Sequence, residues 1–291
     1  MKINLQKELV NICNHNKDGS YSTQYHRKKV LSKVAEDLKK LGFYNLKASG
    51  LKPKHVEALV KSWQGEGKST GTIKNRMAHL RWWSEKVNKK GVIVQNNAHY
   101  GIDKRVYVTN VSKAIITTDE QIQSIKNDYV RCSVELQRAF GLRREECIKF
   151  QPSFAIREKE QVIVLKASWT KGGKERTIPI RTEYQRKVLD RVKITAGSGS
   201  LIPKKLTYRK QLNKYTGIVA YAGMSKLHGL RHKYAQDRYT ELTGRECPAA
   251  GGIKSKELTQ ELKEQDLKVR SIISKELGHE REQITAVYLG R

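Results

Sequence analysis

The C-terminal stretch Leu277–Arg291 reads Leu-Gly-His-Glu-Arg-Glu-Gln-Ile-Thr-Ala-Val-Tyr-Leu-Gly-Arg. Three of its residues, Gly278, His279 and Tyr288, are the most informative in the chain. Gly278 predicts a tight corner at the end of a helix, because glycine adopts the left-handed backbone that ends helices without a steric penalty. The corner would turn the imidazole of His279 inward. Tyr288 follows nine positions later (288 − 279 = 9) on a short terminal segment.

Two arginine motifs precede this stretch, Gly141-Leu-Arg143-Arg-Glu-Glu146 and His228-Gly-Leu-Arg231-His. Side chains three positions apart share one face of a helix, which pairs His228 with Arg231 and Arg143 with Glu146. The Glu146 carboxylate is therefore expected to brace the local cationic cluster.

Apolar periodicity predicts a mainly α protein with a small β-hairpin. Helices are expected over 22–41, 53–64, 72–88, 119–127, 130–150, 182–194, 207–221, 229–243, 256–275 and 281–288. Ser22 or Thr23 would cap the first of these helices. Residues 161–169 and 174–180 are predicted to be strands joined around Lys171-Gly172-Gly173, and Pro179 indicates an edge strand or a strand end.

The pattern changes between residues 91 and 115, where glycine, asparagine and charged residues interrupt short β-branched runs. We therefore expect two domains: a helical domain over 1–105, a linker over 106–116, and a mixed α+β domain over 117–291. Pro248 and Gly251-Gly252 make the stretch from Gly244 to Lys256 a predicted flexible insertion.

The charge of the chain points to a polyanionic partner. It has 58 Lys and Arg against 29 Asp and Glu, a formal net charge of +29 over 291 residues. Such a surface repels itself unless a polyanion neutralises it, so nucleic acid is the expected partner and salt should weaken binding steeply. A ribosomal or otherwise adhesive basic protein is the alternative that charge alone allows.

The four cysteines are Cys13, Cys132, Cys147 and Cys247, and none forms a C-x-x-C pair. This spacing argues against a zinc site and a disulfide scaffold, so we expect reduced thiols, no metal and no cofactor. No signal peptide and no stretch near the ~20 apolar residues of a membrane span are found. A cytoplasmic, nucleoid-associated protein is expected.

The histidines, arginines and terminal tyrosine together suit cleavage of a phosphodiester without a metal. That reaction needs fixed cations on the nonbridging oxygens, a nucleophile, and an acid for the leaving 5′ oxygen. Arginine donates two hydrogen bonds to a phosphate and stays charged, whereas histidine moves protons near neutral pH.

Four motifs resemble those of the tyrosine recombinases, the phage-integrase and Xer family. They are Gly141-Leu-Arg-Arg-Glu-Glu-Cys-Ile, Thr170-Lys-Gly-Gly-Lys-Glu-Arg-Thr-Ile-Pro-Ile, His228-Gly-Leu-Arg-His-Lys-Tyr-Ala, and Leu277-Gly-His with Tyr288. The resemblance covers the chain from about residue 118 to its end. Residues 1–105 resemble the helical core-binding domain of the family more loosely.

The resemblance implies a role for each residue. Tyr288 would form a 3′-phosphotyrosyl bond, and Arg143 and Arg231 would grip the scissile phosphate. The remaining roles are proton transfer for His228, a phosphate hydrogen bond for His279, acid catalysis for Lys171 with Lys174 as the alternative, support for Glu146, and a structural role for His232.

The resemblance also implies double-stranded DNA clamped between the two domains, with four protomers around two duplexes. Accessory DNA-bending or excision factors are possible partners. Candidate DNA contacts are Lys74, Asn75 and Arg81 on the polar face of the 72–88 helix, together with Lys174 and Arg176. A solvated face is the alternative for that helix.

Two departures from the family pattern stand out. Arg231 and His279 are 48 residues apart (279 − 231), longer than the family usually has, and the extra material would include 244–268. Only three residues follow Tyr288, so the helix or strand that docks on a neighbouring protomer in many relatives is expected to be missing.

Integration or excision of a mobile element is the expected activity of such a recombinase. Two alternatives remain at this point. One is a nicking and relaxing enzyme like a type IB topoisomerase, and the other is a non-catalytic DNA-binding assembly protein.

Overall fold

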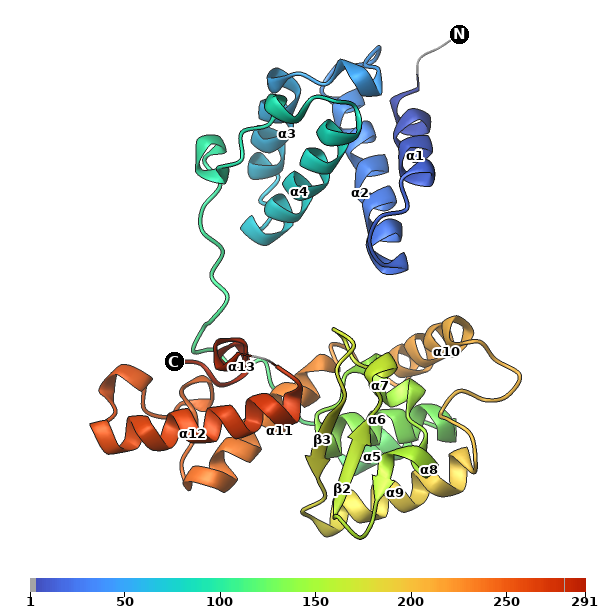
Figure 1. Ribbon diagram of the computed structural model, residues 1–291, viewed down its shortest axis with the longest axis vertical. Coiled ribbons are helices and arrows are strands. Elements are labelled where there is room, and N and C mark those ends of the chain that lie inside the picture. Colours follow the sequence, from blue (N-terminus) through green and yellow to red (C-terminus); the bar gives the residue numbers. More distant parts are fainter. Residues whose placement is uncertain (1–3, 280) are drawn as a thin grey trace. The chain divides into compact units, whose positions relative to one another are not determined.

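The computed structural model describes residues 4–279 and 281–291. It divides the chain into two compact units, Met1–Val106 and Tyr107–Arg291 (Figure 1). Both units are built mainly of helices, and the second contains one small sheet. The predicted fold class is confirmed.

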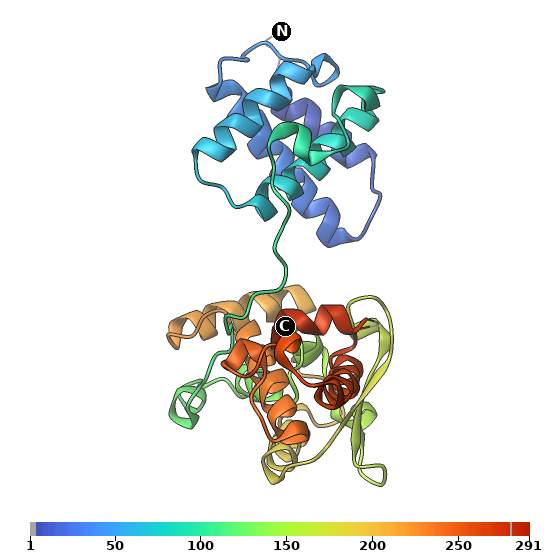
Figure 2. The same ribbon diagram turned by 90° about the vertical axis from the view of Figure 1, so that its left-hand side faces the viewer.

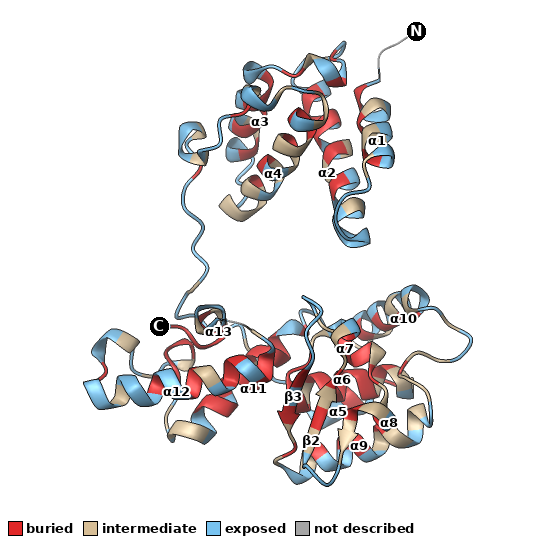
Figure 3. Ribbon diagram, viewed as in Figure 1, coloured by how far each residue is buried: buried red, intermediate tan, exposed pale blue. Residues whose placement is uncertain are grey.

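The first unit has four helices, α1 (Leu5–His15), α2 (Tyr21–Lys40), α3 (Pro53–Gly65) and α4 (Thr70–Lys86). Their buried residues lie on the faces that point toward one another (Figure 3). The core includes Leu9, Leu38, Trp63, Leu80 and Trp83, none of which exposes more than a trace of surface. Helical periodicity predicted α2, α3 and α4, whereas α1 was not predicted from the sequence.

The start of α2 differs from the expected cap. Ser20, rather than Ser22 or Thr23, accepts a hydrogen bond from the Thr23 amide at 3.2 Å. Ser20 has the extended backbone of a cap residue, whereas Ser22 and Thr23 already belong to the first helical turn.

The second unit contains nine helices and three strands within the described residues. The helices are α5 (Asp119–Gln123), α6 (Asp128–Phe140), α7 (Arg144–Lys149), α8 (Pro152–Ala155), α9 (Glu183–Ala196), α10 (Tyr208–Tyr221), α11 (His228–Thr243), α12 (Gln260–Leu277) and α13 (Glu282–Leu289). The chain ends beside α13, which packs on α11 and α12 (Figure 2).

The sheet is antiparallel in the order β1-β2-β3, with β1 (Ile156–Arg157), β2 (Val162–Leu165) and β3 (Arg176–Pro179). Ile163 pairs with Ile178, and both are fully buried. Pro179 lies at the end of the edge strand β3, a position where a missing amide hydrogen is tolerated. The strand predicted over 161–169 is shorter, because residues Ala167–Trp169 form a 3₁₀ turn.

The helix predicted over 130–150 is in fact two helices. α6 ends at Phe140, and Gly141 takes a left-handed backbone with a φ of 61°. A Cβ atom at Gly141 would lie 2.6 Å from the Tyr234 ring, so no larger residue fits there. Apolar periodicity runs through this break and does not reveal it.

The segment predicted to be a flexible insertion is packed into the second unit. Cys247 and Ala249 are buried in its main core, and the turn Pro248–Ala250 packs against α13. The prediction of flexibility over Gly244–Lys256 is therefore wrong, because proline and glycine here shape an ordered turn. All four cysteines are buried and free.

Candidate active site

Tyr288 lies on α13 with its side chain almost fully buried, at 7% exposure. Its hydroxyl is 3.3 Å from Arg231 Nε and 3.4 Å from His228 Nε2, and both of these groups belong to α11. The His279 ring stacks on the Tyr288 ring with centroids 5.4 Å apart. One chain therefore assembles the tyrosine, the arginine and both histidines.

Arg231 is 1% exposed, and every nitrogen of its guanidinium has a partner. NH1 donates to the Gly141 carbonyl at 2.6 Å, and NH2 donates to the Leu277 carbonyl and lies 3.4 Å from His279 Nε2. Burial, with the nearby charge of Arg143, lowers the pKa of Arg231 to about 10. The group remains a cation at neutral pH, held by two helix ends.

The histidines are held in the neutral form. Burial, then the charges of Arg231 and Arg143, lower the pKa of His228, and the same causes lower the pKa of His279 to about 3. His279 Nδ1 lies 3.2 Å from Thr285 Oγ1, which orients the ring. A neutral His228 beside the tyrosine hydroxyl is able to accept its proton.

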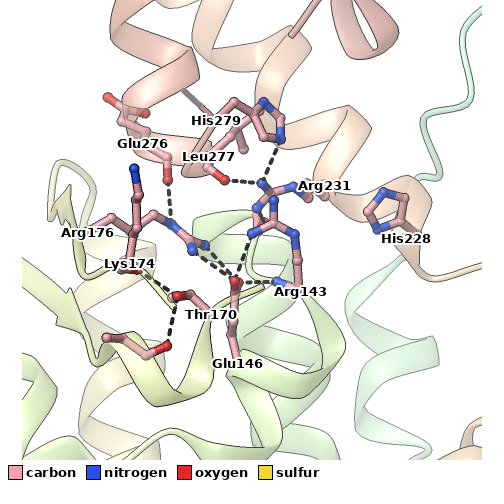
Figure 4. A network of polar contacts seen from close by, with 12 residues as sticks. Arg143, Glu146, Thr170, Lys174, Arg176, His228, Arg231, Glu276, Leu277 and His279 are labelled. Atoms are coloured by element: carbon pink, nitrogen blue, oxygen red, sulfur yellow. Dashed lines mark hydrogen bonds and ion pairs between the residues drawn. The ribbon is translucent and has the colours of Figure 1, made fainter. Parts of the chain in front are cut away.

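Arg143 caps the start of α7 and faces the same site. Its backbone amide and its NH1 donate to the two Glu146 oxygens, at 2.6 and 2.9 Å. The opposite side of Glu146 is held by both terminal nitrogens of Arg176, at 2.8 and 2.7 Å (Figure 4). Glu146 thus fixes one partly exposed and one buried arginine.

Although burial by itself would raise the pKa of Glu146, the hydrogen bond and charge of Arg176, with Arg231 and Arg143, lower it to about 2. The carboxylate is therefore ionised whenever the protein is folded near neutral pH. A buried ion pair of this kind is costly to break from one side, because the remaining charge has no solvent.

Arg176 was predicted as a DNA contact, and the structure shows that its guanidinium also has a supporting role inside the protein. It is 8% exposed, and its Nε donates to the Glu276 carbonyl at 3.0 Å while its other nitrogens hold Glu146. Every nitrogen of the guanidinium is occupied inside the protein. The sequence could not reveal this, because Glu146 and Glu276 are remote from Arg176 along the chain.

The turn between β2 and β3 carries Lys171 and Lys174 exposed on its surface. Both lie on a cleft of about 1540 Å³ whose lining also includes Arg143, His228, His279 and Tyr288. Lys275, Arg281 and Arg291 add further positive charge to the walls. The cleft suits a phosphate anion above the tyrosine.

The candidate DNA contacts on α4 differ among themselves. Asn75 is exposed and Lys74 is partly exposed. Arg81 instead donates to the Val94 carbonyl and to Asn97 Oδ1, at 2.9 and 2.8 Å, which ties α4 to the chain that follows it. Arg81 therefore holds the fold of the first unit.

Four buried side chains that support the site were missed by sequence analysis. They are Thr285, Gln236, Arg270 and Glu276. Gln236 Nε2 donates to the Tyr288 carbonyl at 3.1 Å, and Glu276 accepts from Tyr234 and Arg238. Spacing carries no signal for such residues.

His232, with its ring 4.5 Å from that of Tyr288, has a pKa lowered to about 4 by burial and by His228.

Comparison with protein-family models gives two matches. Residues 2–91 match the phage integrase N-terminal model, and residues 103–237 match the integrase model. No curated protein matches the sequence. The two models cover most of both units and have the same order as the units.

Solved structures with the same fold include three recombinases. A lambda integrase dimer bound to a COC' core site has a TM-score of 0.61 and 15% identity, covering 100% of this chain and 79% of that one. XerH bound to palindromic difH has a TM-score of 0.60 and 16% identity, covering 98% of this chain and 81% of that one. The Tn1549 transposon integrase bound to circular intermediate DNA has a TM-score of 0.57 and 14% identity, covering 99% of this chain and 96% of that one.

The matched models and the fold define a phage-integrase type of protein. The chain belongs to the tyrosine recombinase family. Among the described residues, no helix is both long and apolar enough to cross a membrane.

Proposed function

We propose that the protein cuts and rejoins double-stranded DNA at a specific site through a 3′-phosphotyrosyl intermediate. The observation that carries the proposal is the Tyr288 hydroxyl, 3.3 Å from Arg231 Nε and 3.4 Å from His228 Nε2, at the floor of a cationic cleft. Simple DNA binding gives no reason to bury a tyrosine hydroxyl between these two groups.

The proposed cleavage forms one bond, breaks one bond and transfers two protons. The Tyr288 oxygen attacks the scissile phosphorus and gives its proton to neutral His228. The bond from phosphorus to the 5′ oxygen breaks, and Lys171 protonates that oxygen, so a free 5′-hydroxyl leaves. The charge that develops on the nonbridging oxygens is met by Arg143, Arg231 and the imidazole of His279. Attack by a 5′-hydroxyl reverses these steps and rejoins the strand.

The proposed partners are two duplexes and three further copies of the chain. A lambda integrase tetramer bound to a Holliday junction has the same fold, with a TM-score of 0.57. The net charge of +29 supports DNA binding, with Lys74 and Asn75 of α4 as contacts in the first unit. Integration or excision of a mobile element is the activity we propose for this assembly.

The nucleophile is tested by trapping the protein on DNA. Duplexes from the DNA flanking its own gene are incubated with the protein and run on a denaturing gel. Wild type and Tyr221→Phe, a change at an exposed tyrosine, should give a covalent adduct, and Tyr288→Phe should give none. An adduct that persists in Tyr288→Phe would refute the assignment.

The acid is tested with a substrate whose 5′-bridging oxygen is replaced by sulfur. A thiolate leaves without protonation, because thiols are far more acidic than alcohols. Lys171→Ala should cleave ordinary DNA slowly and the sulfur substrate at the wild-type rate. If Lys174→Ala shows this pattern and Lys171→Ala does not, Lys174 is the acid.

A further inference from the structure

The extended segment Asn110–Ile115 lies against α11, which carries His228 and Arg231. The Ile115 amide donates to the Gly229 carbonyl at 3.1 Å. A Cβ atom on Gly229 would lie 2.4 Å from Ile115 Cγ1 and 2.7 Å from the Lys113 carbonyl oxygen, so a larger residue at position 229 would collide with the segment. The segment is therefore fixed to the first turn of the catalytic helix.

The same segment reaches the nucleophile through one buried amide. Ser112 Oγ donates to Gln236 Oε1 at 3.1 Å, and Gln236 Nε2 donates to the Tyr288 carbonyl at 3.1 Å. Gln236 is 6% exposed, so its amide has little alternative contact with water. The Tyr288 carbonyl can only accept, so it takes the Nε2 end of the Gln236 amide, and Ser112 holds the Oε1 end.

A second connection lies just beyond the tyrosine. Asn110 Nδ2 donates to the Arg291 carbonyl at 2.7 Å, and the Arg291 amide donates to Asn110 Oδ1 at 2.8 Å. The preceding Gly290 carbonyl accepts from Arg270 NH1 at 2.9 Å, and Arg270 is itself paired with Asp266 at 2.7 Å. The end of α13 is thus held from two sides.

We propose that Asn110 and Ser112 are positioning residues for Tyr288, so that the first residues of the second unit set the place of the nucleophile. This inference rests on the proposed cleavage reaction. Both side chains are exposed and neither touches the reacting atoms, so they act through Arg291 and Gln236. The segment begins a few residues after the end of the first unit, so Tyr288 is tied to the part of the second unit that directly follows the first unit along the chain.

The test measures single-turnover cleavage at saturating DNA, together with DNA affinity and the thermal midpoint, in the full chain. Ser112→Ala, which loses one hydrogen bond to Gln236, should slow cleavage about tenfold, and Asn110→Ala, which loses two hydrogen bonds to Arg291, should slow it at least as much. Both variants should leave affinity within about twofold. Thr109→Ala, an exposed neighbour, is the matched control and should cleave at the wild-type rate. Ser112→Thr keeps the hydroxyl and should restore cleavage.

A double-mutant cycle tests the route. Ser112→Ala combined with Gln236→Ala should be no slower than Gln236→Ala alone, because Ser112 acts only through that amide. Additive losses, a slowing in Thr109→Ala, or losses that follow affinity or thermal midpoint would overturn the inference. An adduct that resists Tyr288→Phe would instead overturn the proposed function.

Discussion

Asp37 of the first unit and Glu146 of the second are both buried carboxylates, and their contacts serve different purposes. In the first unit, Asp37 accepts from the Trp63 indole at 3.0 Å and lies near Lys33 and Arg76, at 3.1 and 3.5 Å. In the second unit, Glu146 holds Arg143 and Arg176 beside the tyrosine. The first carboxylate fastens an aromatic core, whereas the second fixes cations that a phosphate would bind.

Burial of a charge therefore does not by itself identify a functional site. Asp37 closes the packing of α2 against α3 through a neutral indole. Glu146 is surrounded by guanidinium groups, one of which is still open to the cleft. Each carboxylate has two cations beside it, so what separates the two cases is that Arg143 lines the same cleft as Tyr288.

The largest expected effect comes from Glu146→Gln. Neutralising one side of this buried pair leaves Arg176 without its countercharge and should lower the free energy of unfolding by about 3–5 kcal/mol. Asp37→Asn keeps an oxygen for the Trp63 indole and should cost about 1.5–3 kcal/mol. Urea unfolding followed by tryptophan fluorescence measures both, with Trp169 in the second unit and Trp63, Trp82 and Trp83 in the first.

The rate of DNA cleavage should also distinguish Glu146→Gln from Asp37→Asn. Glu146→Gln should also slow cleavage at saturating DNA, because Arg143 loses its support, while Asp37→Asn should not. Lys187→Met, at an exposed position of α9, serves as the control and should stay within about 0.5 kcal/mol of wild type. Equal losses of cleavage in both carboxylate variants would remove the distinction.

Arg231→Lys tests whether the positive charge at this position is enough for cleavage. Lysine keeps the charge but cannot replace three separate contacts with the Tyr288 hydroxyl and the Gly141 and Leu277 carbonyls. Single-turnover cleavage should fall about 10²–10³-fold, the cost of losing a fixed donor at the reacting phosphate. A rate near that of wild type would show that charge alone is needed.

Acid should weaken the second unit through its buried histidines. The pKa values of His232 and His279 are lowered from 6.5 to about 4 and about 3. Between pH 6.5 and these values the unfolded chain binds protons that the folded chain does not, so the free energy of unfolding falls as pH falls. The slope is up to about 1.4 kcal/mol per pH unit for each histidine.

Unfolding experiments at pH 7.5, 6 and 5 measure this slope. His232→Gln removes one titrating group and should flatten the slope by up to one proton. An unchanged slope in that variant would show that His232 binds its proton equally well in both states. Below pH 4.5 the protonation of Glu146, with its pKa of about 2, adds a further loss of the same sign.

The smallest effect is expected from Lys74→Ala on α4. Loss of one phosphate contact should weaken DNA binding a few-fold and lower the slope of log affinity against log salt by about one. Cleavage at saturating DNA should be unchanged, because Lys74 belongs to the first unit. Fluorescence anisotropy over a salt series measures the slope, and Arg81→Ala should instead lower the stability of that unit.

Helical periodicity in this sequence was sufficient to predict α2, α3, α4, α9, α10 and α11 within a few residues. It failed at Gly141, where one predicted helix is two, and at residues 244–256, where a predicted flexible stretch is packed core. Both failures have one cause: the Tyr234 ring against Gly141 and the core around Cys247 are contacts between distant parts of the chain.

The helical class and the high positive charge follow from the amino-acid sequence alone. So do the motifs that contain Arg143, Lys171, His228, Arg231, His279 and Tyr288. Three features are visible only in the tertiary structure. Arg176 is buried against Glu146, Thr285 orients His279, and Asn110 and Ser112 contact Arg291 and Gln236, which lie next to Tyr288 or bind it. The physical reason is range: periodicity reports which face of a segment is buried, whereas a hydrogen bond between residues 181 positions apart, as for Asn110 and Arg291, exists only after the core has brought them together.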